Sequence, residues 1–190
     1  MPLSETTLSF LDALFEKRTH NPPIRAFFTG LLYEPRSTIL REIAENLKSH
    51  GFALDIRGRA IGQPRIPDSE YWSILSHERI ILTTADQVES SDLDWRWIKQ
   101  LTYRYLEVLA SGALLVAPEV PGIRRYFVPG EHFVSFTTPD HASEVIEYYL
   151  TNEIERAKIA QKGRERAKAL VAAHSFWVGV DIGLGKNSLT

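Results

Sequence analysis

The sequence predicts an α/β fold in which helices cover both faces of a parallel, doubly wound sheet. Two observations lead to this class. Short apolar runs rich in strand formers alternate with helical patterns from about residue 24 to about residue 175. Most of these runs are apolar along nearly their whole length, as strands are when both faces of a sheet are covered. The 190 residues are enough for one sizeable domain with a terminal extension.

The expected elements follow in chain order. The apolar runs predict strands at 24–30, 52–58, 79–85, 113–119 and 132–138. The helical patterns lie within 33–51, 68–78, 95–111, 142–150 and 152–174. Gly51 should end the first of these helices. Asp68 or Ser69 is expected to cap the second, and the third has an alternative start at Thr102 or Tyr103.

The two ends of the chain are predicted to flank a domain at residues 24–177. Within residues 1–23, Leu8, Leu11, Leu14 and Phe15 follow helical spacing. We expect an amphipathic helix there, packed on this domain or on a partner. Acidic residues occupy this end where a signal peptide would carry basic ones. Residues 178–190 contain glycines and a lysine but lack the spacing of a phosphate-binding loop, so a flexible tail is expected.

Composition narrows the function classes. The net charge is -2 with no long run of like charges, which argues against nucleic acid as the main partner. The chain has no cysteine, so disulfides and thiolate metal sites are excluded, and its six histidines show no ligand spacing. No apolar run approaches the ~20 residues that span a bilayer. We expect a cytoplasmic protein without a transmembrane segment.

The first candidate binding loop follows the strand at 24–30. Sheets of this kind bind ligands at the carboxyl ends of their strands, where the strand order reverses. Gly30 permits close approach of the backbone there. A helix opens just beyond, near Pro35, and a helix N-terminus attracts anions. Arg36 lies at that end and is either a phosphate contact or a surface arginine on a plain strand–helix turn.

The most informative stretch is residues 103–136, which read YRYLEVLASGALLVAPEVPGIRRYFVPGEHFVSF. The expected helix carries an arginine and a glutamate one turn apart and ends at a glycine, and an apolar strand and two Pro-Gly turns follow. These features are Arg104, Glu107, Ala110-Ser111-Gly112, Pro121-Gly122, Phe127 and Pro129-Gly130-Glu131. In this order and spacing they resemble the nucleotide-sugar-binding domain of group 1 glycosyltransferases. The stretch is most similar to the subgroup often labelled spore-maturation-protein-like.

Two other segments share the resemblance. Residues 27–43 resemble the family's first strand and its glycine loop. Residues 150–177 resemble its C-terminal helices, including the ending His174-Ser175-Phe176. The likeness therefore covers about residues 24–177. It implies a Rossmann-like parallel sheet with helices on both faces, as in the C-terminal half of a GT-B glycosyltransferase.

The resemblance implies a ligand and a role for Glu107. The ligand is a nucleotide-diphosphate sugar, used as donor without an obligatory metal. Glu107 would accept hydrogen bonds from the ribose hydroxyls, and a carboxylate can accept from two adjacent hydroxyls at once. The alternative is that Glu107 only pairs with Arg104 on the same helix face. Arg104 would either orient Glu107 or reach the diphosphate.

The sequence departs from the family at one position. Many members carry a second glutamate ahead of the ribose-binding one, where it faces the transferred sugar. Lys99 stands there in this chain, so that contact is in doubt. Lys99 either neutralises the diphosphate or is solvated. If the helix starts at Thr102 or Tyr103, the backbone N–H groups of these residues face the phosphates.

The second departure concerns length. A GT-B enzyme has two Rossmann-like domains with the active site between them, and this chain has room for one. A partner supplies the acceptor-binding half, or the chain is a fragment, or it binds a nucleotide without transfer. The resemblance implies a hexosyltransferase-type enzyme, retaining as most members are; the alternative is a non-catalytic nucleotide-binding or assembly module. His77 and Glu78 are expected at the surface, near the nucleotide base.

Overall fold

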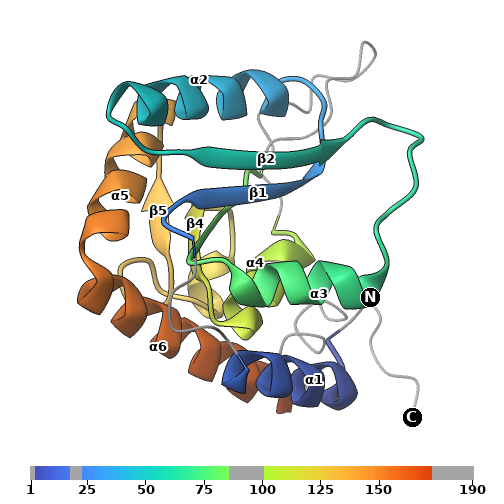
Figure 1. The fold of residues 1–190 in the computed structure, drawn as a ribbon. Helices are drawn as coiled ribbons and strands as arrows, with labels where there is room; N and C mark the ends of the chain where they lie inside the picture. The colour runs from blue at the N-terminus through green and yellow to red at the C-terminus, as the bar shows by residue number, and fades with distance from the viewer. Residues whose placement is uncertain (1–2, 18–22, 86–100, 173–190) are drawn as a thin grey trace.

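The computed structural model describes residues 3–17, 23–85 and 101–172. Five strands form one sheet in the order β2-β1-β3-β4-β5, and every neighbouring pair is parallel (Figure 1). The strands are β1 (Ala26–Leu31), β2 (Leu54–Arg59), β3 (Ile80–Leu82), β4 (Leu114–Pro118) and β5 (Val134–Phe136). β3, β4 and β5 lie inside predicted strand segments, and β1 and β2 each extend one residue beyond theirs, to Leu31 and Arg59. The predicted parallel α/β fold with a Rossmann-like sheet is therefore confirmed.

Helices join the strands and cover both faces of the sheet. They are α1 (Glu5–Glu16), α2 (Arg36–Ser49), α3 (Asp68–His77), α4 (Tyr103–Ser111), α5 (Pro139–Thr151) and α6 (Glu153–Ala172), with a 3-10 turn η1 at Ile123–Arg125. In Figure 1, α2 lies on one side of the sheet and α1, α3 and α4 lie on the other. No helix in the part of the chain that the structure describes is long and apolar enough to cross a bilayer.

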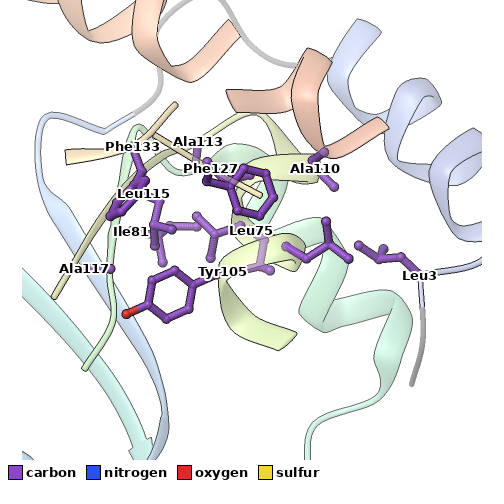
Figure 2. Close-up of a cluster of buried hydrophobic side chains, with 14 of the residues drawn as sticks. Leu3, Leu75, Ile81, Tyr105, Ala110, Ala113, Leu115, Ala117, Phe127 and Phe133 are labelled. Carbon is purple, nitrogen blue, oxygen red and sulfur yellow. The ribbon is translucent and has the colours of Figure 1, made fainter. Parts of the chain in front are cut away.

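Alternate residues of β1, β3 and β4 pack into two separate cores, whereas β2 and β5 contribute to only one of them. In β1, Ala26 and Phe28 pack with α2 and α5 on one face, whereas Phe27 packs on the other. That second cluster joins the sheet to α1, α3, α4 and α6, and Figure 2 shows part of it, including Phe127 and Phe133. This alternation follows from the two-residue period of a strand. Burial of both faces explains why these three strands read as nearly continuous apolar runs.

The N-terminal helix packs on this same domain. α1 contacts α3, α4 and α6, and Leu11 is 1% exposed within the second core. At its start, the Ser4 hydroxyl accepts a hydrogen bond from the amide of Thr7. Asp12 pairs with Arg164 and with Lys168, both on α6. Of the two neighbours that the sequence left open for this helix, the structure shows the domain itself; the boundaries at 23 and 177 stay predictions.

Several local expectations differ from the structure. Pro67 precedes α3 and provides no side-chain cap, so the expected caps Asp68 and Ser69 are wrong. Helix α5 starts three residues before the expected Ala142, because Thr138 caps it and Pro139 fits its first turn. The third predicted helix takes its later alternative start, at Tyr103. Residues 95–100, with Lys99, and the predicted tail at 178–190 lie outside the described residues.

Glu78 is a further correction. Its carboxyl group is buried, with 4% of the residue exposed, and it accepts a hydrogen bond of 2.7 Å from Arg25. Both residues precede parallel strands, Arg25 before β1 and Glu78 before β3. They therefore lie at the amino ends of the strands, opposite the edge where such sheets bind ligands. Glu78 is a structural ion-pair residue rather than a surface residue near a nucleotide.

Candidate functional site

The topology places a reversal of strand order between β1 and β3. From β1 the chain crosses to β2 on one side, and from β2 it returns to β3 on the other side of β1. The loops that leave β1 and β3 therefore diverge, and a crevice opens between them at the carboxyl ends of the strands. Gly30 in β1 and Thr83 and Thr84, directly after β3, lie at this edge.

A cleft of about 860 Å³ occupies this position. Residues from six places in the chain line it: the end of β1 and start of α2, the end of β2, the loop before α3, α3 itself, the segment directly after β3, and the start of α4. Five arginines and three carboxylates are among them: Arg36, Arg57, Arg59, Arg65, Arg104, Asp68, Glu70 and Glu107. The excess of positive charge favours an anionic ligand.

The structure brings six of the seven predicted site residues to this one cleft. They are Gly30, Arg36, Thr102, Tyr103, Arg104 and Glu107. The seventh, Lys99, lies outside the described residues. Residues separated by more than 70 positions in the sequence thus line one space, as the doubly wound topology requires.

Three side chains meet at the α4 side of the cleft. The Tyr71 hydroxyl, from α3, donates a hydrogen bond of 2.6 Å to Oε2 of Glu107. The same hydroxyl accepts a hydrogen bond from the guanidinium of Arg104. Arg104 also lies over the Tyr71 ring, 4.8 Å from its centre, and its Nε is 3.9 Å from Oε2 of Glu107. The predicted contact between Arg104 and Glu107 therefore exists, but the tyrosine hydroxyl joins them more closely.

Burial keeps the Tyr71 hydroxyl protonated. Desolvation is the main cause that raises the pKa of Tyr71 well above its ordinary value of 10, and the negative charge of Glu107 raises it further. The positive charge of Arg104 opposes this shift without cancelling it. At neutral pH, Tyr71 is therefore a hydrogen-bond donor to the carboxylate. Sequence reasoning missed Tyr71, because nothing in its helix distinguishes it from a packing aromatic.

Arg36 ties the two diverging loops together. Its Nε donates to the Thr84 hydroxyl at 2.7 Å, and its guanidinium also donates to the carbonyl oxygen of Leu31 at 3.0 Å. The guanidinium lies 4.2 Å from the centre of the Tyr33 ring. Arg36 therefore lines the cleft and also holds the cleft wall in place, and its contact with a phosphate stays a prediction.

Two backbone features shape the floor of the cleft. Gly30 has φ +154°, and a Cβ there would come within 3.3 Å of the Phe28 ring and 3.9 Å of the Arg104 guanidinium. A side chain at residue 30 would therefore intrude beside Arg104. Helix α4 begins after Thr102 without a side-chain cap. Thr102 and Tyr103 line the cleft, so first-turn amides lie beside it, as an anion site at a helix N-terminus requires.

A comparison with protein families gives one match over most of the chain. The sequence model of a family described as "Glycosyl transferase-like" matches residues 36–175. This span includes α2 through α6 and all the elements that line the cleft except β1. No curated protein matches the sequence significantly.

Solved structures with the same fold include a glycosyl transferase domain, a fucosyltransferase and a protein in complex with UDP-glucose. The C-terminal domain of a group 1 family glycosyl transferase, LpcC from Francisella tularensis, aligns with a TM-score of 0.58 and 15% identity, over 81% of this chain and 88% of that domain. Anabaena HepE in complex with UDP-glucose aligns with a TM-score of 0.55 and 12% identity, over 98% of this chain and 46% of HepE. An alpha1,3-fucosyltransferase with GDP-fucose aligns with a TM-score of 0.53 and 16% identity, over 84% of this chain and 45% of the fucosyltransferase chain.

These alignments identify the fold and show what share of each related chain this protein spans. The predicted likeness to the C-terminal half of a GT-B glycosyltransferase is confirmed at the level of the fold. The chain spans less than half of the HepE and fucosyltransferase chains. The spore-maturation-protein-like subgroup is not tested by these findings and stays a prediction.

Proposed function

Because the chain belongs to the glycosyl transferase-like family, we propose that its cleft binds a nucleotide-diphosphate sugar as the donor for glycosyl transfer. The observation that carries this proposal is the meeting of Arg104, Glu107 and Tyr71 inside a basic cleft at the reversal of strand order. A donor of this kind has two recognisable parts, a diphosphate and a ribose diol. The cleft offers a matching group for each.

The diphosphate would lie at the N-terminus of α4, near Arg36 and Arg104. First-turn amides of a helix carry partial positive charge and point toward an anion. Thr102 and Tyr103 supply this end of α4. Beside Arg104, Gly30 leaves room for the backbone to approach the ligand. During transfer, the same groups would stabilise the charge that develops on the leaving nucleotide diphosphate.

The ribose would bind to Glu107. A carboxylate accepts hydrogen bonds from two adjacent hydroxyls, and the Glu107 side chain is 16% exposed, so it is partly shielded from water. In this proposal Glu107 holds the ribose and does not act as acid or base. The UDP-glucose and GDP-fucose found with the HepE and fucosyltransferase structures support a nucleotide sugar as the ligand class, with the base left open.

A second candidate function is a nucleotide-binding or assembly module that transfers nothing. Lys99, at the position where many family members carry a sugar-facing glutamate, favours this candidate. The paired Arg104 and Glu107 favour the enzyme. An acceptor-binding half, on another domain or a partner chain, belongs to the enzyme proposal, as do a retaining mechanism and a cytoplasmic location.

Calorimetry with UDP, GDP, ADP and their sugar derivatives tests the proposal on the 190-residue protein. We expect weak but saturable binding of at least one of them. The test variant is Arg104→Met, which removes the charge beside Glu107 and keeps an unbranched side chain, and its matched control is Arg124→Met. Arg104→Met should weaken binding, whereas Arg124→Met, at an exposed arginine outside the cleft lining, should not. Absence of binding by the unmodified protein to every nucleotide at millimolar concentration would overturn the proposal.

A further inference from the structure

Tyr71 is the side chain that joins α3 to the proposed ribose-binding carboxylate. Its hydroxyl donates to Glu107 and accepts from Arg104, so it lies between the two charged groups. Tyr71 precedes Glu107 by 36 residues and belongs to a different helix. The ring packs edge-on against Trp72, with 5.0 Å between ring centres, and against the Arg104 guanidinium on another side. These contacts leave the hydroxyl little freedom.

We propose that Tyr71 is a positioning residue that fixes the Glu107 carboxylate for recognition of the ribose diol of the nucleotide. This inference rests on the proposed function, because it assigns a task to Tyr71 only if Glu107 binds ribose. It adds a residue from α3 to a recognition step otherwise assigned to α4.

The geometry shows how the positioning works. Both Tyr71 and Arg104 engage the same carboxylate oxygen, Oε2 of Glu107. A ligand hydroxyl can therefore bind Oε1 while Tyr71 keeps its hydrogen bond. A glutamate side chain has three rotatable bonds, and its carboxylate otherwise rotates about the last of them. The bond from Tyr71 fixes that rotation in advance, which lowers the entropy lost when the ribose binds.

The effect of this positioning is selective for the ribose hydroxyls. A phosphate contact weakens by the same factor whether or not the sugar carries a 2′-hydroxyl. A misoriented Glu107 weakens only the bonds to the hydroxyls. The ratio of affinities for a ribonucleoside diphosphate and its 2′-deoxy counterpart therefore isolates the role of Tyr71 from general effects on the cleft.

The experiment compares Tyr71→Phe with the unmodified protein by calorimetry, with UDP, GDP or ADP, whichever binds, and its 2′-deoxy counterpart. Tyr71→Phe removes one oxygen atom and keeps the ring. We expect the ribo-over-deoxy ratio to fall by about three- to tenfold, because one hydrogen bond that orients a charged acceptor is lost. Glu107→Gln should lower the ratio as well, and adding Tyr71→Phe to it should change the ratio little further.

The matched control is Tyr148→Phe. The Tyr148 hydroxyl also donates to a glutamate, Oε2 of Glu155 at 2.8 Å, but it lies on α5, outside the cleft lining. This variant should keep the ratio of the unmodified protein. If Tyr71→Phe is destabilised, the ratio still reports the effect, because partial unfolding lowers both apparent affinities by the same factor.

A second measurement needs no variant. In protein carrying ¹³C-labelled tyrosine rings, the Tyr71 signal should move further on adding the ribonucleotide than on adding its 2′-deoxy form. Equal shifts, or an unchanged ribo-over-deoxy ratio in Tyr71→Phe, would overturn the inference and leave the proposed function standing. Failure of the unmodified protein to bind any nucleotide would overturn both.

Discussion

Phe15 on α1 occupies the space that a side chain at residue 112 would need. An ideal Cβ built on Gly112 would lie 2.5 Å from Cε2 of Phe15. Gly112 caps the C-terminus of α4 with φ +81°, a conformation that L residues other than glycine rarely adopt. The guanidinium of Arg164 covers the ring of Phe15 at 4.0 Å from its centre. Gly112, which ends α4, is therefore also the residue against which Phe15 of the N-terminal helix α1 packs.

We expect Gly112→Ala to destabilise the protein. The left-handed backbone costs about 1–3 kcal/mol for a residue with a Cβ, and the forced displacement of Phe15 adds about 1–3 kcal/mol of overpacking. In a domain of this size, each kcal/mol lowers the melting temperature by about 2–4 °C. Thermal unfolding followed by circular dichroism measures the change.

Gly122→Ala provides the control for that measurement. Gly122 also has φ +81°, but an added Cβ there meets nothing within 4 Å. It carries the backbone strain without the clash, so Gly112→Ala should melt lower than Gly122→Ala. Equal melting temperatures would show that α1 is not held against Gly112 in solution.

We expect Glu107→Gln to weaken nucleotide binding without unfolding the domain. The amide keeps the shape but removes the charge, and loss of a charge-assisted hydrogen bond costs about 1.5–3 kcal/mol, which is roughly ten- to a hundredfold in affinity. Calorimetry measures the affinity and thermal unfolding the stability. Glu119→Gln, at an exposed pair with Arg124, is the control. A variant that melts much earlier yet binds normally would make Glu107 a structural partner of Arg104.

The stability of the protein should depend on Glu153 only above acidic pH. Hydrogen bonds from Arg156 mainly, and the charge of Arg79, lower the pKa of Glu153 from 4.5. A lowered pKa in the folded protein means that the stabilisation is present above about 4.5 and is lost as pH falls through the lower, folded value. Because the Glu153 side chain is 52% exposed, water screens it, and we expect Glu153→Gln to cost less than about 1 kcal/mol at pH 7.

Urea unfolding at pH 7 and at pH 3 tests this dependence. The difference in unfolding free energy between Glu153→Gln and the unmodified protein should shrink at the lower pH, because pH 3 lies below the ordinary carboxyl pKa of 4.5 and the stabilisation is lost as pH falls from there toward the lowered pKa of the folded protein. Glu119→Gln should show a smaller difference at pH 7. A Glu153→Gln difference that stays constant with pH would point to a packing effect instead of a charge effect.

We expect no acceptor-dependent glycosyl transfer by the 190-residue protein alone. Positioning two reactants together supplies about 7–11 kcal/mol of barrier reduction, and the described residues build one α/β domain with one face of such a site. Release of nucleotide diphosphate from sugar nucleotides, with and without sugar and peptide acceptors, is the measurement. Slow hydrolysis is the expected maximum. Turnover that rises with an acceptor would mean that this chain carries an acceptor site of its own.

The sequence predicted the fold more fully than the site. The strands β1, β3 and β4 could be found because burial on both faces makes them apolar along much of their length, and this property is local. The pairing of Arg104 with Glu107 could also be predicted, since three residues of separation place two side chains on one helix face. Helix starts were less predictable: α3 follows Pro67 without the side-chain cap that Asp68 or Ser69 would have given.

Contacts across the fold explain what the sequence missed. The burial of Glu78 depends on Arg25, 53 residues earlier, and the hydroxyl of Tyr71 meets Glu107 only because α3 packs beside α4. A single sequence carries no signal for such pairs. The second role of Arg36, as the link between the loops after β1 and β3, likewise appears only when Thr84 is brought beside it.

The ion pair between Asp12 and Lys168 has a consequence for how the protein is made. The two residues are 156 positions apart. At the usual synthesis rate of about 5–20 residues per second, a ribosome needs about 8–30 s to cover that distance. During that time α6 has not been made, so the apolar face of α1 that carries Leu11 lacks one of the helices it packs against in the folded protein. Until α6 has been made, the docking of α1 on the domain therefore stays incomplete.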